Sequence, residues 1–315
     1  MNRQLGRTAL QVSPLMLGGN VFGWTADEAT SFSILDAFVA GGGNFIDTAD
    51  VYSAWVPGHV GGESETVLGK WFKRSGKRSQ VVLATKVGMQ LAPDKQGLKA
   101  AYIERAVEDS LRRLQSDYID LYFSHKDDAE TPFEETLGAY DRLVRAGKVK
   151  VIGASNYTAP RLREALAVSG EKKLPAYQVL QPHYNLCERA DYETNLEPVC
   201  LEMGLGVVAY FSLASGFLSG KYRSEADLAK SPRGRGVQKY LNARGFKILD
   251  ALDAVAKQLN ATPAQVALAW LMARKSITAP IASATSVAQV QELVGAMRLQ
   301  LGSEDLQKLN DASAA

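Results

Sequence analysis

The chain has 315 residues, of which 46% are hydrophobic and 22% are charged, an ordinary composition for a globular protein. Its 36 basic and 34 acidic residues leave a formal net charge of +2, so the balance of charge predicts no nucleic-acid partner. The N-terminal stretch lacks the apolar core of a signal peptide, and no apolar run approaches the ~18 residues of a membrane span. We therefore expect a soluble, cytoplasmic protein with no membrane partner.

Short apolar runs alternate with helical patterns along most of the chain. The runs are bounded by turn residues, and several are rich in Val, Ile, Tyr and Phe, which is typical of strands. They lie near residues 15–19, 43–47, 81–86, 118–124, 149–155, 176–181, 206–211 and 279–282. Helical patterns span Thr25–Val39, Glu63–Phe72, Leu98–Leu114, Phe133–Arg145, Gly245–Gln258, Pro263–Arg274, Val287–Met297 and Ser303–Asp311. Alternating strands and helices indicate a parallel sheet with crossover helices.

Eight parallel strands are enough to close a barrel whose inward side chains fill its interior. We therefore predict an α/β fold of the (β/α)8 TIM-barrel type, preceded by a β-hairpin over Arg3–Pro14 and followed by extra C-terminal helices. The segment 215–245, rich in glycine and basic residues, is predicted to be one long loop. Since no linker divides the chain, residues 1–315 are expected to form a single domain.

Four polar residues lie at or just beyond the ends of three apolar runs. Asp47 and Tyr52 close the stretch NFIDTADVYS, Lys86 ends VVLATK, and His125 ends YIDLYFSH. In a barrel, the residues at the C-terminal ends of the strands and in the loops after them form the active site. Singly, Tyr52 is more simply an ordinary half-buried tyrosine and Asp47 a turn former. Together the four residues predict one proton-transfer site.

The expected chemistry of this site follows from the four side chains. A lysine near the barrel mouth is costly to bury without a partner, and Asp47 is the natural partner for Lys86. The lysine cation favours the tyrosinate, so we expect it to lower the pKa of Tyr52 from its usual value near 10. Tyr52 would then act as a general acid, while His125 orients a carbonyl oxygen or shares in the proton relay.

Competing motifs do not fit their structural contexts. Tyr122 and Lys126 have the spacing of a helical tyrosine–lysine pair, but Tyr122 lies in a predicted strand. Gly204 and Gly206 precede a strand rather than follow one, so they do not form a dinucleotide fingerprint. The three histidines are scattered and the two cysteines do not form a metal-type pair, so no metal site is predicted.

Several separate motifs resemble those of the aldo-keto reductase family, and they occur in the family's order. They are NFIDTADVYS, GGESETVLGKW, LATK, DYIDLYFSH, VKVIGASNY, YQVLQPHYNL and VVAYFSLASGFLSGKY, which together cover nearly the whole chain. The resemblance implies a (β/α)8 barrel that reduces an aldehyde or ketone with a nicotinamide cofactor, usually NADPH. It also implies that Tyr52 is the general acid and that Lys86, Asp47 and His125 complete a catalytic tetrad.

The resemblance implies cofactor-binding residues as well. Ser155 and Asn156 match the pair that binds the nicotinamide carboxamide, and either Gln178 or Gln181 matches the glutamine beside it, with Gln178 the better fit. Tyr210 matches the aromatic residue that stacks on the nicotinamide ring. The loop that wraps the pyrophosphate is matched by Ser212, Leu213, Gly216, Leu218 and Lys221. Such a loop takes the place of a separate dinucleotide-binding domain.

Two stretches depart from the family pattern. Where the family often has a Lys-Ser pair and a later Arg that hold the 2′-phosphate, PIASATSVAQVQEL has Ser283, Ala284 and Gln289. Ser283 and Gln289 still offer hydrogen bonds, and Arg233, Arg235 or Lys239 would supply charge, so NADPH is expected with NADH as the alternative. The second departure is Ser-His-Lys-Asp-Asp around His125, where many members have Leu-His-x-Pro-Asp.

Phe22, Trp24 and Trp55 are predicted walls of the substrate pocket, each with the alternative of lying in the core. The substrate class is a small-molecule carbonyl, and the oligomeric state is open. The resemblance extends to barrel proteins that serve as potassium-channel β subunits, so a cofactor-binding regulatory role is the second hypothesis. Because the sequence carries no long N-terminal extension of the channel-blocking kind, we favour the enzyme.

Overall fold

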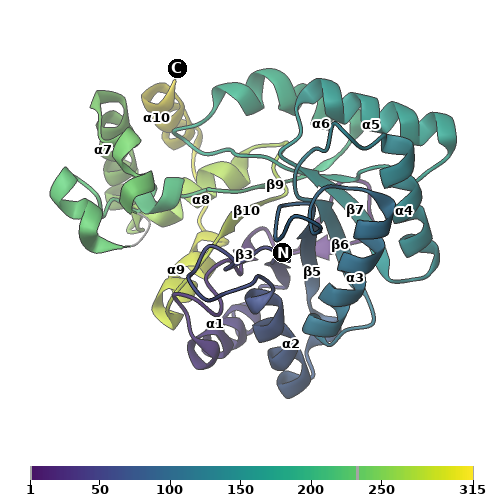
Figure 1. The fold of residues 1–315 in the computed structure, drawn as a ribbon. Coiled ribbons are helices and arrows are strands. Elements are labelled where there is room, and N and C mark those ends of the chain that lie inside the picture. Colours follow the sequence, from purple (N-terminus) through teal and green to yellow (C-terminus); the bar gives the residue numbers. More distant parts are fainter. Residues whose placement is uncertain (1, 232–233, 315) are drawn as a thin grey trace.

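The computed structural model describes residues 2–231 and 234–314. Eight parallel strands close into a barrel surrounded by helices, as Figure 1 shows, with β10 pairing both β9 and β3. The strands are β3 (Met16–Gly18), β4 (Phe45–Asp47), β5 (Val82–Val87), β6 (Ile119–Ser124), β7 (Val149–Ser155), β8 (Val179–Gln181), β9 (Gly206–Ala209) and β10 (Ala279–Ala282). The predicted TIM barrel and its eight strands are therefore confirmed.

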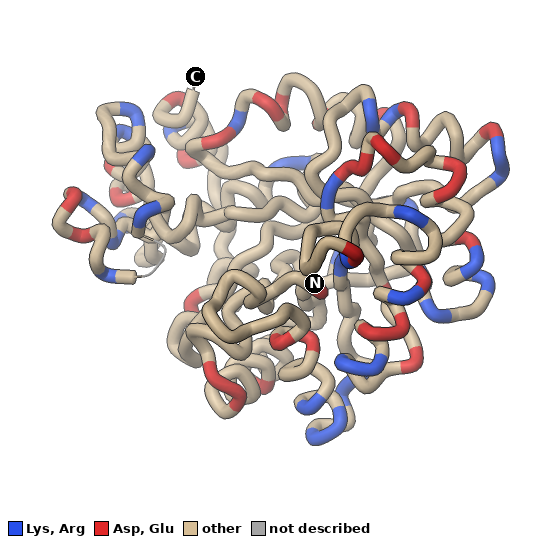
Figure 2. Tube along the Cα trace, viewed as in Figure 1, with Lys and Arg blue, Asp and Glu red and all other residues tan. Residues whose placement is uncertain are grey.

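Helices cover the outside of the barrel and extend the C-terminal part of the chain. They are α1 (Glu28–Ala40), α2 (Glu63–Ser75), α3 (Ala100–Leu114), α4 (Phe133–Arg145), α5 (Ala159–Lys172), α6 (Glu197–Met203), α7 (Ala243–Leu259), α8 (Pro263–Ala273), α9 (Val287–Ala296) and α10 (Ser303–Ser313). The first helix begins three residues later than predicted, because the carboxylate of Asp27 accepts a hydrogen bond from the amide of Thr30 and caps it. Figure 2 shows basic and acidic residues interspersed over these outer helices.

Alternation along each strand sorts side chains between the barrel interior and the layer beneath the helices. On β5, Ala84 belongs to the interior cluster while Leu83 and Val87 belong to the outer one. The interior is filled by eleven buried side chains, namely Leu5, Val12, Met16, Phe45, Ala84, Leu121, Phe123, Val179, Val208, Ala279 and Ile281. Because this core is packed, a ligand has room only at the strand ends.

The N-terminal hairpin closes the end of the barrel at which the strands begin. Strands β1 (Arg3–Gln4) and β2 (Gln11–Val12) pair antiparallel, as predicted, and Leu5 and Val12 join the interior cluster. Gly6 has a φ of 57°, and a Cβ there would lie 2.4 Å from the backbone nitrogen of Gly206. The hairpin therefore packs directly against the start of β9, and a side chain at Gly6 would push it away.

The segment predicted as one long loop is built mostly of short turns. In the residues of this segment that the structure describes there are four 3₁₀ segments, namely η3 (Ala214–Ser219), η4 (Glu225–Lys230), η5 (Gly234–Gly236) and η6 (Gln238–Tyr240), before α7 begins at Ala243. Elsewhere η1 (Arg78–Gln80) precedes β5 and the π-helical turn η2 (Tyr192–Leu196) leads into α6. The long segment runs beside the C-terminal end of the barrel, where its first turn borders the site.

Candidate active site

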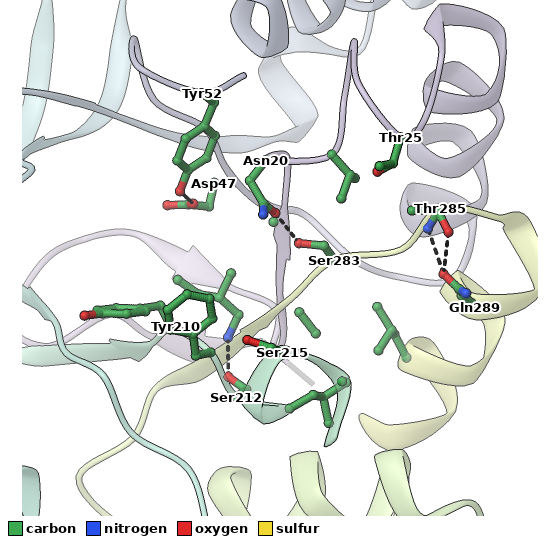
Figure 3. A pocket seen from close by; sticks show the side chains of 18 of the residues that line it. Asn20, Thr25, Asp47, Tyr52, Tyr210, Ser212, Ser215, Ser283, Thr285 and Gln289 are labelled. Atoms are coloured by element: carbon green, nitrogen blue, oxygen red, sulfur yellow. Dashed lines mark hydrogen bonds between the residues drawn. The ribbon is translucent and has the colours of Figure 1, made fainter. Parts of the chain in front are cut away.

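A cavity of about 820 Å³ opens at the C-terminal end of the barrel. Its lining draws on the ends of most of the strands or the residues just after them: Gly18, Asp47, His125, Ser155, Gln181, Tyr210 and Ser283. Figure 3 shows Tyr52 and Asp47 at one end and Thr285 and Gln289 at the other. The volume lies within the usual range of ligand pockets, and the elongated lining suits an extended cofactor with room beside it.

Three of the four predicted tetrad residues form one hydrogen-bonded cluster. The Nζ of Lys86 lies 2.6 Å from Oδ1 of Asp47 and donates to the Tyr52 hydroxyl over 2.8 Å and to the carbonyl of Thr48 over 2.8 Å. The Tyr52 hydroxyl in turn donates to Oδ2 of Asp47 over 2.7 Å. Lys86 is fully buried, which would be costly for an unpaired ammonium. The carboxylate of Asp47 and two oxygen acceptors offset that cost.

The pKa of Tyr52 shifts in the opposite direction to the one predicted. Burial raises it well above 10, and the carboxylate of Asp47, which accepts its hydrogen bond, raises it further. The expectation that Lys86 lowers the pKa is therefore wrong for this cluster, because a negative charge faces the phenol as well as the ammonium. Burial also lowers the pKa of Lys86, with Asp47 opposing that shift. The phenol stays protonated at neutral pH, which a proton donor requires.

His125 lies next to Tyr52 in the wall of the cavity. The two rings meet edge to face with centroids 6.1 Å apart, and the imidazole lines the cavity. Burial, with a smaller contribution from the Lys86 ammonium, holds the pKa of His125 well below 6.5, so the ring is neutral at neutral pH. Among the described residues its buried Nδ1 has no hydrogen-bond partner. A neutral imidazole at this place is suited to orient a bound oxygen by hydrogen bonding.

Ser155 and Asn156 lie beside this cluster at the end of β7. Asn156 adopts a φ of 57°, and its Nδ2 donates to the carbonyl of His125 over 2.8 Å and to the Ser155 hydroxyl over 3.2 Å. Its Oδ1 accepts a hydrogen bond of 2.7 Å from the hydroxyl of Tyr210. Both residues line the cavity, while their binding of a carboxamide stays a prediction.

The positions of Gln178 and Gln181 relative to β8 reverse the predicted preference for Gln178. Gln178 precedes the strand, and its carbonyl accepts a hydrogen bond from Gly206 beside the N-terminal hairpin, at the opposite end of the barrel. Gln181 ends the strand and lines the cavity, and its Nε2 donates to Oδ1 of Asp47 over 3.0 Å. The candidate glutamine is therefore Gln181.

The loop after β9 supplies the middle of the cavity. Ser212, Leu213, Gly216 and Lys221 all line it, and their contact with a pyrophosphate stays a prediction. Ser212 is fixed by accepting the backbone amide of Ile281 over 3.1 Å and donating to the carbonyl of Ala209 over 2.9 Å. Leu218 does not reach the cavity, because it packs fully buried in the core beneath this loop.

Ser283 and Gln289 lie toward the far end of the cavity. The hydroxyl of Ser283 donates to Oδ1 of Asn20 over 2.5 Å, and Gln289 accepts the amide of Thr285 over 2.8 Å. Of the cations expected to assist them, Arg233 lies outside the described residues. Arg235 and Lys239 lie outside the cavity lining, and Lys239 pairs with Glu188 over 2.6 Å. Lys221 is thus the cation that the described lining provides.

The three predicted substrate-pocket residues have different positions. Trp55 lines the cavity, is 49% exposed, and packs edge to face on Tyr52. Trp24 supports Trp55 from behind, with ring centroids 5.6 Å apart, rather than lining the cavity. Phe22 is fully buried in the outer core, so its alternative interpretation as a core residue is the correct one.

Sequence reasoning missed several lining residues, among them Gly18, Asn20, Met89 and Phe211. Gly18 ends β3 and Asn20 follows it closely, so the rule of strand ends would have found them. Met89 and Phe211 lie on loops directly after β5 and β9, where sequence alone gives no measure of which side chains turn inward.

Comparison with known proteins agrees with this barrel fold. A model of the Aldo/keto reductase family matches residues 14–314. An uncharacterized oxidoreductase of Bacillus subtilis, YrpG, is 38% identical over 98% of this chain and 94% of its own length. The aldo-keto reductase yakc [NADP(+)] of Schizosaccharomyces pombe is 32% identical over 93% and 84%. A probable voltage-gated potassium channel subunit beta of Arabidopsis thaliana is also 32% identical, over 92% and 89%.

A TIM barrel with a cavity at the C-terminal ends of its strands is the arrangement found in barrel enzymes and their relatives. Within that class the chain belongs to the aldo/keto reductase family, since the family model covers nearly all of it. In the described ranges, no helix is long and apolar enough to cross a membrane, and no group of three or more His, Cys, Asp or Glu side chains is arranged to hold a metal ion.

Proposed function

We propose that the chain is an NADPH-dependent reductase that converts an aldehyde or ketone to an alcohol. The observation that carries this proposal is the Tyr52 hydroxyl, which lies within hydrogen-bond distance of both Lys86 and Asp47 on the wall of an extended cavity. A protonated phenol beside a ligand cavity is a general acid with access to a bound carbonyl oxygen. A cytoplasmic location is part of the same proposal.

Each residue has a defined role in the proposed reaction. The chemistry that a bound nicotinamide would supply is hydride for the carbonyl carbon. Tyr52 delivers its proton to the carbonyl oxygen, and the Lys86 ammonium, 2.8 Å from the phenol oxygen, stabilises the negative charge that remains. Asp47 keeps Lys86 in place, while the neutral imidazole of His125 orients the carbonyl. Ser155, Asn156 and Gln181 hold the carboxamide end of the cofactor.

The residues present fit a nicotinamide dinucleotide along the whole cavity. Tyr210 offers a ring face, Ser212 and Lys221 flank the middle, and Ser283 and Gln289 offer polar atoms at the far end. We propose NADPH because Ser283 and Gln289 offer hydrogen bonds at the end where the 2′-phosphate would lie and because a relative is named for NADP(+). Comparing kcat/KM with NADPH and with NADH tests this preference, and equal values would contradict it.

A panel of aldehydes, ketones and sugars tests the proposed activity, with NADPH oxidation followed by absorbance. The proposal expects several carbonyl compounds to be reduced by the wild-type protein and the alcohol product to be detectable. The absence of reduction across a panel that spans all three classes, together with absent cofactor binding, would contradict it.

The second candidate function is a cofactor-binding regulatory subunit. It is favoured by one comparison, the 32% identity over 92% of the chain with a probable potassium channel subunit beta. Both candidate functions use the same cofactor site. The rate of carbonyl reduction and the presence of a bound partner protein therefore distinguish them. A stable membrane protein that co-purifies with the chain, combined with slow carbonyl reduction, would favour the subunit.

A further inference from the structure

His183 packs against the back of Tyr210, the ring proposed to carry the nicotinamide. The two residues form a parallel β-bridge beyond the ends of β8 and β9, with the Tyr210 amide donating to the Pro182 carbonyl over 2.9 Å. Paired residues of neighbouring parallel strands project to the same side. Their rings accordingly stack with centroids 5.3 Å apart and an angle of 16° between the planes.

The imidazole itself is held in place from two sides. Asn185, which is fully buried, lies 3.4 Å from Nε2 of His183 and donates to the carbonyl of Phe211 over 2.9 Å. The side-chain oxygen of Asn185 accepts the amides of Cys187 and Glu188, which fixes the turn that carries it. The Phe211 ring meets the imidazole edge to face at 5.4 Å. His183 is thus part of a rigid support rather than a freely rotating surface group.

Tyr210 connects this support to the reacting end of the cavity. Its ring lines the cavity while His183 lies behind it, outside the lining. Its hydroxyl donates to Asn156 over 2.7 Å, and Asn156 donates to the carbonyl of His125 over 2.8 Å. The plane of the Tyr210 ring is therefore set by His183 on one face and by Asn156 at its hydroxyl.

We propose that His183 is a positioning residue that holds the Tyr210 ring in the plane on which the nicotinamide stacks. The inference rests on the proposed function and deepens it. Hydride transfer requires the nicotinamide ring to be placed to within a fraction of an ångström, and the Tyr210 ring is the surface on which it would stack. His183 contacts neither substrate nor cofactor and acts only through Tyr210.

The charge state of His183 suits this role. Burial lowers its pKa, and of the charged groups that face it Glu188 raises the pKa and Lys239 lowers it. Glu188 is itself paired with Lys239 over 2.6 Å, so the two largely compensate each other. A neutral imidazole stacks on Tyr210 without placing a cation beside a nicotinamide that is positively charged when oxidised.

Comparing the binding of NADPH with the binding of a fragment that lacks the nicotinamide distinguishes a positioning role of His183 from a general structural role. NADPH carries the nicotinamide, whereas adenosine 2′,5′-bisphosphate shares its adenine end and lacks that ring. By calorimetric titration, His183→Ala is expected to weaken NADPH binding about fivefold, the usual worth of an aromatic pair, while adenosine 2′,5′-bisphosphate stays within about twofold. His183→Phe keeps a stacking ring and is expected to restore NADPH binding. His59→Ala, which removes a histidine outside the cavity lining, serves as the control.

Three results would overturn the inference: equal weakening of both ligands by His183→Ala, unchanged binding of both, or His183→Phe as weak as His183→Ala. Single-turnover hydride transfer at saturating NADPH gives a second readout, in which His183→Ala should slow the step and His183→Phe should recover it. Failure of the wild-type protein to bind NADPH or NADH would instead overturn the proposed function, and the inference with it.

Discussion

The hydroxyl of Tyr52 takes part in two hydrogen bonds of opposite direction, accepting from Lys86 and donating to Asp47. The donated bond keeps the proton on the phenol, since the carboxylate and the surrounding burial both raise its pKa. The ammonium does not make the phenol acidic in the resting state. Its proposed role is to stabilise the tyrosinate once the proton has moved to the carbonyl oxygen.

This arrangement makes a prediction for the pH dependence of reduction. Tyr52 has a raised pKa and remains protonated up to at least its usual range near 10, and His125 has a lowered pKa and remains neutral above about pH 6.5. We therefore expect kcat/KM for reduction to be flat between about pH 7 and about pH 9. A pH profile measures this, and an alkaline limb with an apparent pKa between about 7 and about 8 would show that the lysine lowers the tyrosine pKa after all.

At the residue scale, residue type and position next to a strand end predicted the places of Asp47, Lys86 and His125, because the strands of a barrel bring their C-terminal ends together at one end. The direction of the Tyr52 shift was not predictable, since it depends on which neighbour accepts the phenol proton. Phe22 was likewise beyond sequence reasoning, because aromatic side chains line pockets and fill cores with equal ease.

At the scale of elements, the approach of α2 to α3 depends on one glycine. A Cβ at Gly69 would lie 2.0 Å from the carbonyl oxygen of Arg113, which is backbone and cannot turn aside. The same pair of helices is joined by the buried carboxylate of Glu65, which accepts from Arg113 over 2.7 Å and from Thr85 on β5 over 2.6 Å. Close packing here holds α2 against the strand that carries Lys86.

Two glycine-to-alanine changes test this packing with the same chemistry. Gly69→Ala is expected to lower the free energy of unfolding by about 1–3 kcal/mol, because the helices must move apart. Gly138→Ala, in α4, meets only the flexible end of Arg142 at 3.8 Å, so it should raise that free energy by about 0.5–1 kcal/mol through helix propensity. Urea unfolding measures both, and a stabilised Gly69→Ala variant would contradict the packing argument.

The sequence predicted which strands and helices exist better than it predicted the residues at which they begin and end. Gln178 and Gln181 lie three residues apart within one apolar run, yet they fall at opposite ends of a strand of three residues. Only pairing with β7 and β9 fixes where β8 begins and ends, and that pairing joins residues far apart in the sequence. The wrong choice of glutamine follows from this lack of local information.

At the scale of the whole molecule, the two ends of the barrel have different roles. The end at which the strands begin contributes to stability, and the end at which they finish carries the cavity. Alternation of strand and helix patterns was sufficient to predict the closed barrel, because few other folds accommodate eight such units. That residues 1–315 form one domain remains a prediction, which a single cooperative unfolding transition would support. The hairpin seals the end opposite the cavity through Leu5 and Val12.

Leu5→Ala tests this separation. The change empties a fully buried position, so we expect a loss of about 2–5 kcal/mol of unfolding free energy, with the NADPH dissociation constant within about twofold of wild type. Leu201→Ala makes the same truncation at a side chain that is 58% exposed and should be close to neutral. A large loss of cofactor affinity in Leu5→Ala would show that the two ends are coupled.

The central claim, that Tyr52 is the proton donor of a carbonyl reductase, is tested most directly by Tyr52→Phe. Tyr118→Phe, at a tyrosine outside the cavity lining, is the matched control. With a carbonyl compound that the wild-type protein reduces, we expect Tyr52→Phe to lower kcat by about 100-fold to 10,000-fold while NADPH binds within about threefold of wild type. Near wild-type turnover in Tyr52→Phe would contradict the account.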